Sequence, residues 1–260
     1  MAELIARREG AVGRVIFSNP AKFNAVTYDM WCALPQVLGD FERDDAVRVI
    51  VLTGDGEKAF VLGADISQLD QNQATPKVRR RYASAVDAAY QAPTLCRKPT
   101  IAKIRGLCLG GGLGLAAACD LRFAGDDAVF WMPAARLGLG YNFVGIRRLV
   151  DLIGVANTAD IFFSARKIDA ADALRMGFLS RVIPAADLDR EIEAYCKAVA
   201  ENAPLTIAAA KRGILEVRMD PEARDLEALQ QMIERCYASQ DYREGRAAFD
   251  EKRRPQFGGR

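Results

Sequence analysis

The alternation of apolar and polar positions divides the chain into a strand-rich first part and a helix-rich second part. The run Val47–Thr53 is apolar at all but two positions and is typical of a strand buried on both faces. Helical spacing of apolar residues appears between the early strands at Thr27–Arg43 and Lys77–Cys96. The remaining predicted strands are Leu4–Arg7, Arg14–Ser18, Thr100–Ile104, Leu121–Ala124, Ala128–Trp131 and Leu179–Val182.

Helical periodicity dominates from Asp169 onward, after two helical segments that begin at Gly145. Proline favours the first turn of a helix, which places one helix start at Pro204. No low-complexity linker interrupts the chain, so we expect a core over residues 1–200 and a helical C-terminal region over residues 201–260. The predicted helices are Gly145–Ile153, Ala156–Phe163, Ala170–Met176, Leu188–Asn202, Pro204–Val217 and Glu222–Ser239.

Four glycines interrupt an apolar stretch at Leu109–Gly114. Glycine gives up side-chain packing and backbone order, so such a run indicates that something approaches the bare backbone. The run precedes an alanine-rich helical segment, which places the N–H groups of Gly111 and Gly112 at a helix N-terminus, where an anion or a developing oxyanion binds. Close packing of helices is the alternative explanation.

A second segment, Gly63–Ala64–Asp65, follows the strand Val47–Thr53 and is either a simple turn or a second source of backbone N–H groups. Two such segments that offer one N–H each to the same oxygen provide what acyl-transfer and enolate chemistry requires. The pair is a far more specific signal than either segment alone.

Composition narrows the possible functions. The 260 residues are half hydrophobic, and 36 basic side chains nearly cancel 34 acidic ones, so neither nucleic acid nor an anionic membrane is the expected partner. Six cysteines without a CxxC pair predict reduced core thiols in a cytoplasmic protein. The absence of histidine excludes Ser-His-Asp chemistry and removes the commonest metal ligand, so no metal is expected.

The order of four motifs resembles the crotonase, or enoyl-CoA hydratase/isomerase, superfamily over essentially the whole chain. This resemblance implies an α/β fold in which ββα repeats wind into a spiral, as in ClpP and crotonase, with a helical C-terminal region that mediates assembly into a homotrimer or a dimer of trimers. It also implies an acyl-CoA substrate, with coenzyme A entering only as part of the thioester and no other cofactor. The motifs are Asn19–Ala25, Ala59–Ile66, Gly110–Gly112 and Phe249–Arg254.

The resemblance also assigns residues to the site. The backbone N–H groups of Ala64 and Gly111 would form an oxyanion hole that stabilises a thioester enolate. Phe249 and Lys252 match a pair that reaches the coenzyme A of a neighbouring subunit. The other positions that match substrate contacts are Lys22, Phe23, Lys58, Asp65, Ile66 and Gly110.

The chain departs from the hydratase pattern at its acid and base. Hydratases of this family carry two glutamates where this sequence has Gly114 and Ala134. The stretch Tyr141–Ile146 is most similar to the methylmalonyl-CoA decarboxylase branch, in which the tyrosine contacts the reacting carboxylate. That branch, however, has a histidine at the position of Ala64 and a glutamate at that of Gly114.

We therefore expect a lyase that decarboxylates a malonyl-type CoA ester, with Tyr141 orienting the carboxylate. Three alternatives stay open: an enoyl-CoA hydratase or isomerase with a non-standard site, a catalytically silent member that binds acyl-CoA, and a hydrolase of diketones that acts without coenzyme A. Tyr141 is otherwise an aromatic side chain that packs on the core.

Overall fold

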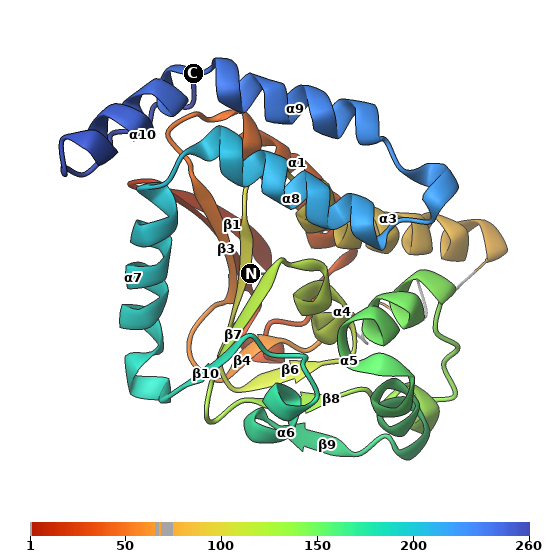
Figure 1. Ribbon diagram of the computed structural model, residues 1–260. Helices are drawn as coiled ribbons and strands as arrows, with labels where there is room; N and C mark the ends of the chain where they lie inside the picture. The colour runs from red at the N-terminus through yellow and green to blue at the C-terminus, as the bar shows by residue number, and fades with distance from the viewer. Residues whose placement is uncertain (1, 66–67, 69–74) are drawn as a thin grey trace.

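The structure is a computed structural model that describes residues 2–65, 68 and 75–260, and two sheets form its centre (Figure 1). The larger sheet has the strand order β1-β2-β3-β5-β7-β10, and all neighbours are parallel except β1 and β2. Its strands are β1 (Glu3–Glu9), β2 (Val12–Ser18), β3 (Val49–Gly54), β5 (Thr100–Ile104), β7 (Leu121–Gly125) and β10 (Arg181–Ile183). The smaller sheet consists of β4 (Ala59–Val61), β6 (Leu107–Leu109), β8 (Val129–Trp131) and β9 (Lys167–Asp169).

The chain passes between the two sheets in a regular way. Three successive pairs of strands, β3 with β4, β5 with β6 and β7 with β8, each give one strand to either sheet. A helix follows each pair, and these helices are α3 (Pro76–Leu95), α4 (Gly111–Ala118) and α5 (Phe143–Ser164). The expected spiral of ββα repeats is therefore confirmed.

Strand β3 shows why the larger sheet is buried on both faces. Ile50 and Leu52 point into the main core, which also contains side chains of α1 (Tyr28–Arg43) and α4. Val49 and Val51 point the other way and pack with side chains of α7 (Leu188–Ala200). This period of two along a strand buried at every position is what a central strand between two helical layers requires.

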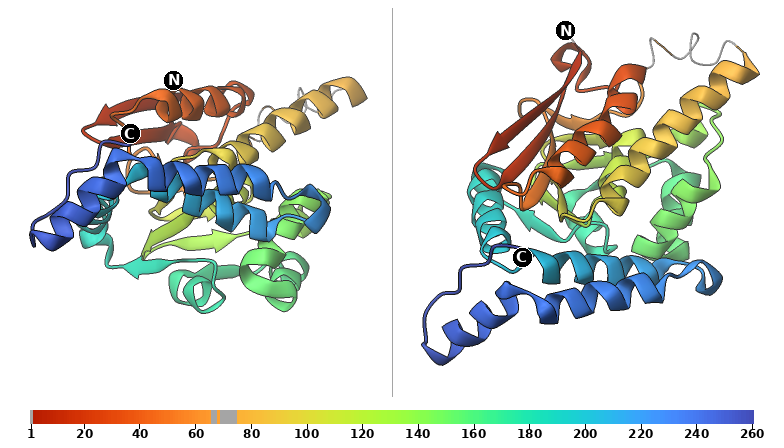
Figure 2. Two further views of the ribbon diagram at one scale, coloured as in Figure 1. Left: turned by 45° about the horizontal axis from the view of Figure 1, so that its top comes forward. Right: turned by 90° about the horizontal axis from the view of Figure 1, so that it is seen from above.

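Three helices complete the chain after the spiral: α8 (Pro204–Arg218), α9 (Leu226–Ala238) and α10 (Gln240–Asp250). Helices α8 and α9 run beside each other over one side of the spiral, and α10 extends outward (Figure 2). In the described part of the chain, no helix combines the length and apolar character needed to cross a membrane.

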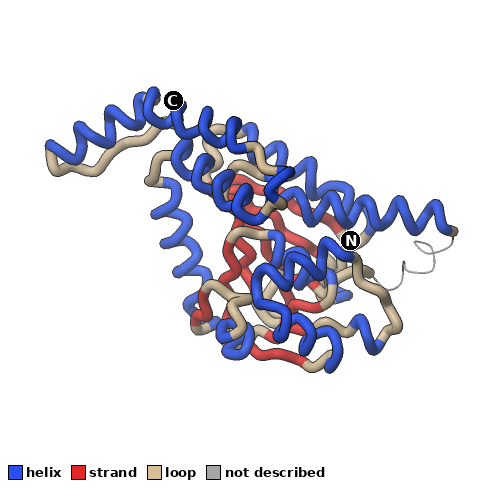
Figure 3. The backbone as a smooth tube through the Cα atoms, turned by 45° about the vertical axis from the view of Figure 1, so that its right-hand side comes forward, coloured by secondary structure: helices blue, strands red, loops and turns tan. Residues whose placement is uncertain are grey.

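The short elements differ most from the predictions (Figure 3). The strands β4, β6 and β9 are three residues each, too short to show a period, and were not predicted. The predicted helix Glu222–Ser239 begins instead at Leu226, and the Ser239 hydroxyl, which accepts from the Tyr242 N–H, starts α10 as a separate helix. The two predicted segments between Gly145 and Phe163 belong to α5 and meet at Gly154, whose φ of 77° bends the helix.

Burial raises the pKa of four cysteine thiols in the core, to about 11 for Cys96 and Cys196, to about 12 for Cys119, and well above its ordinary value for Cys108. The unfolded chain loses these protons at lower pH than the folded chain. The free energy of unfolding should therefore fall as the pH rises from about 9 to about 11, as measured by urea unfolding. The variant Cys196→Ala should show a shallower fall, because it has one buried thiol fewer; equal slopes would contradict this explanation.

Candidate active site

Helix α4 begins in the glycine run and presents its first N–H groups without partners inside the helix. Gly110, with a φ of 50° that favours glycine, forms the N-cap, and its carbonyl accepts from the N–H groups of Leu113 and Gly114. The Gly110 N–H itself donates to the Trp131 carbonyl at 2.8 Å. The N–H of Gly111 stands at the first helical position, where no earlier carbonyl of the helix can reach it.

The second segment, Gly63–Asp65, is held by two backbone hydrogen bonds to Val26. The Gly63 carbonyl accepts from the Val26 N–H at 2.7 Å, and the Asp65 N–H donates to the Val26 carbonyl at 3.0 Å. Ala64 lies between these two groups. Because successive peptide groups of an extended segment point to opposite sides, its N–H points away from Val26.

The two segments touch through their glycines. A Cβ atom on Gly63 would lie 2.7 Å from the Gly111 nitrogen, and one on Gly111 would lie 3.1 Å from the Gly63 Cα atom. Gly63 also has a φ of 90°. The two segments are therefore in contact, which places the backbone of Ala64 next to the start of α4.

Tyr141 lies directly before α5, whose N-cap Asn142 accepts from the Gly145 N–H at 2.8 Å. The ring packs edge-on against Phe162, with 5.1 Å between ring centroids, and covers Gly145, where a Cβ would lie 2.4 Å from a ring carbon. Within the described residues the buried Tyr141 hydroxyl has no hydrogen-bond partner. Burial raises its pKa to about 12, so the hydroxyl is a neutral donor.

The space beside Gly114 is filled by Tyr90, a residue that the sequence analysis did not single out. A Cβ on Gly114 would lie 2.7 Å from Cζ and 2.8 Å from the hydroxyl oxygen of Tyr90. That hydroxyl donates to the Gly111 carbonyl at 3.0 Å. Ala134, at the other expected glutamate position, is buried at the start of a 3₁₀ turn, Ala134–Arg136.

The predicted contacts to coenzyme A are distributed unevenly. Lys22 binds both carboxylate oxygens of Asp65, at 2.8 and 3.1 Å, so this pair joins the Gly63 segment to the turn after β2. Phe23 and Lys58 are exposed, and Ile66 lies outside the described residues. The described residues contain no group of three His, Cys, Asp or Glu side chains suited to a metal.

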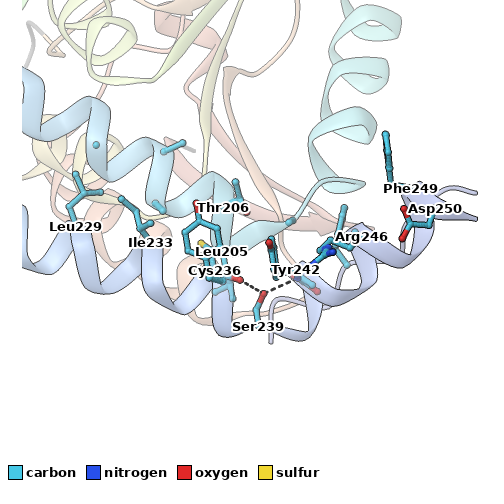
Figure 4. Close-up of a pocket in the computed structure, with 18 residues that line it drawn as sticks. Leu205, Thr206, Leu229, Ile233, Cys236, Ser239, Tyr242, Arg246, Phe249 and Asp250 are labelled. Carbon is cyan, nitrogen blue, oxygen red and sulfur yellow. Dashed lines mark hydrogen bonds between the residues drawn. The ribbon is translucent and has the colours of Figure 1, made fainter. Parts of the chain in front are cut away.

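Phe249 and Lys252 lie elsewhere, at the end of the outward-pointing α10 (Figure 1). Phe249 is 84% exposed and borders a cavity of about 810 Å³ between α8, α9 and α10. Leu229, Ile233 and Tyr242 also face this cavity (Figure 4). Its lining contains neither Gly111 nor Tyr141, so it is separate from the glycine contact.

Comparison with known proteins gives the class. The family model described as enoyl-CoA hydratase/isomerase matches residues 7–260. A short-chain-enoyl-CoA hydratase of Clostridium acetobutylicum is 31% identical over 96% of this chain and 95% of its own, and a peroxisomal Delta(3,5)-Delta(2,4)-dienoyl-CoA isomerase of Arabidopsis thaliana is 28% identical over 96% and 93%. A crystal structure from Magnetospirillum magneticum, titled an enoyl-CoA hydratase/carnithine racemase, superposes with a TM-score of 0.94 at 31% identity and covers 100% of this chain and 97% of that one.

The chain therefore belongs to the enoyl-CoA hydratase/isomerase family, within the crotonase superfamily. The resemblance inferred from the four motifs is confirmed at this level. The closer similarity to the decarboxylase branch and the roles assigned to individual residues stay predictions.

The variant Gly63→Ala tests the contact between the segments. It combines an unfavourable positive φ with a methyl group 2.7 Å from the Gly111 nitrogen, so we expect a loss of about 2–5 kcal/mol in the free energy of unfolding, measured with urea. Gly56→Ala is the matched control, because Gly56 has a φ of 72° and open space around it, and it should lose only about 1–2 kcal/mol. Equal losses would show that the backbone contact is not tight.

Proposed function

We propose that this protein acts on an acyl-CoA thioester and stabilises its enolate through the N–H groups of Ala64 and Gly111. The contact between Gly63 and Gly111 carries the proposal, because it brings backbone from two parts of the chain to one place. Both N–H groups would donate to the thioester oxygen, on which negative charge develops. Loss of one such donor costs about 10²–10³ in rate in other enzymes.

The relatives favour an enoyl-CoA substrate. Those compared above are named as a hydratase and an isomerase of enoyl-CoA esters, and both reactions pass through a thioester enolate or a related charge on the same oxygen. We therefore place hydration or isomerisation of an enoyl-CoA first. Because Gly114 and Ala134 replace the two glutamates that the resemblance leads one to expect, proton transfer in this chain would use another group or solvent.

Decarboxylation of a malonyl-type CoA ester is the second candidate, and the side chains favour it. The bond between the α-carbon and the carboxylate breaks, carbon dioxide leaves, and the electron pair enters the thioester as the enolate. The α-carbon then takes a proton from water. This reaction needs no strong base, which suits a site with Gly114 and Ala134, and the neutral Tyr141 hydroxyl is available to orient the carboxylate.

A substrate panel separates the candidates. Purified protein is incubated with crotonyl-CoA and, separately, with methylmalonyl-CoA, and mass spectrometry follows the hydrated thioester or propionyl-CoA. We expect turnover of at least one of them. Hydration without decarboxylation would eliminate the second candidate, and decarboxylation without hydration the first. Binding by calorimetry without turnover of either would leave a silent member that binds acyl-CoA.

The variant Tyr141→Phe tests the tyrosine. Removal of a buried hydroxyl without a partner should leave the free energy of unfolding unchanged or raise it by about 1–3 kcal/mol. At the same time, decarboxylation should slow by tenfold or more, measured as kcat/KM. Tyr195→Phe is a control on α7, on the other face of the larger sheet. Unchanged decarboxylation in Tyr141→Phe would remove this residue from the mechanism.

We also propose assembly into a homotrimer or a dimer of trimers, as the resemblance implies. The apolar cavity between α8, α9 and α10 supports this proposal, because Phe249, Tyr237 and Tyr242, which line it, are exposed in the single chain. Large exposed apolar patches mark surfaces that bind other molecules. Phe249 and Lys252 would then approach the coenzyme A of a neighbouring subunit.

A further inference from the structure

Tyr90 connects three parts of the proposed site. It projects from α3, is 6% exposed, and packs edge-on against Trp31 of α1 with 5.6 Å between ring centroids. Its hydroxyl donates to the Gly111 carbonyl at 3.0 Å. The peptide group that follows Gly111 is therefore fixed by a side chain from another helix.

The ring of Tyr90 occupies the space that a side chain at position 114 would need. Any Cβ on Gly114 would lie 2.7–2.8 Å from the end of the tyrosine side chain, closer than real contacts allow. Glycine inside a helix costs about 1 kcal/mol relative to alanine, so its presence here calls for a reason. The reason is that Tyr90 uses this space.

We propose that Tyr90 is a positioning residue for the reaction: its hydroxyl, by donating to the Gly111 carbonyl, fixes the first turn of α4, which carries the Gly111 N–H. This inference rests on the proposed function, since it requires that the Gly111 N–H bind the thioester oxygen. Tyr90 itself makes no contact with the reacting atoms.

Acetoacetyl-CoA provides a test that does not depend on which reaction the enzyme catalyses. Its acidic α-carbon ionises to an enolate with a characteristic ultraviolet absorbance, so the apparent pKa of the bound thioester reports directly how well the site stabilises an enolate. We expect the native protein to lower this pKa relative to the free thioester. In Tyr90→Phe, which retains the ring and loses the hydroxyl, the pKa should rise by about one unit, equivalent to about tenfold weaker stabilisation.

Thr94→Val is the matched control. Thr94 also lies on α3 and donates to a carbonyl of α4, that of Ala118 at 3.0 Å, but at the opposite end of that helix. Both variants lose one hydrogen bond between the same two helices, so they should lose similar thermal stability. Only Tyr90→Phe should change the enolisation of the bound thioester.

The outcomes are distinguishable. If the native protein does not lower the pKa of the bound thioester, the proposed oxyanion hole is wrong. If it does, and Tyr90→Phe lowers it equally, the role of Tyr90 is overturned while the proposed function stands. Should Tyr90→Phe fail to fold by circular dichroism, Gly114→Ala decides by the same measurement, because its methyl group displaces the tyrosine hydroxyl and should raise the pKa of the bound thioester in the same way.

Discussion

The backbone contact between Gly63 and Gly111 determines where the rest of the site can lie. Gly63 follows β4 and Gly111 follows β6, and these strands are parallel neighbours in the smaller sheet. Parallel strands end at the same edge, which is where α/β proteins commonly bind ligands. A Cβ on Gly63 would lie 2.7 Å from the Gly111 nitrogen, so this close approach of the two turns requires glycine at position 63.

Main-chain donors of this kind do not specify a reaction, because they stabilise charge on an oxygen whatever formed it. The side chains around them decide which bond breaks and where protons go. This chain has Gly114 and Ala134, which have no acid or base, and Tyr90, whose hydroxyl donates to the Gly111 carbonyl, occupies the space beside Gly114. Membership of the family therefore fixes the fold, and the reaction has to be argued from these residues.

The sequence alone predicted those elements whose pattern lies within one short segment of the chain. The apolar run Val47–Thr53 and the glycine run before the alanine-rich helix correctly predicted β3 and α4, and the four motifs predicted the spiral. The strands β4, β6 and β9 were missed because three residues show no clear period. Tyr90 was missed for a different reason: its fit to Gly114 depends on how α3 packs against α4, and nothing within either segment specifies it.

Buried polar side-chain atoms without a hydrogen-bond partner include two close to the residues of the proposed site. Among the described residues, three buried side-chain atoms lack a hydrogen-bond partner, on Trp31, Tyr141 and Arg148. Each such group costs about 1–3 kcal/mol, so a chain selected for stability alone would replace it. Trp31 packs on Tyr90, whose hydroxyl donates to the Gly111 carbonyl. Under the proposed function, a thioester held by the N–H groups of Ala64 and Gly111 would bring an acceptor oxygen close to the first turn of α4, which the Tyr90 hydroxyl holds.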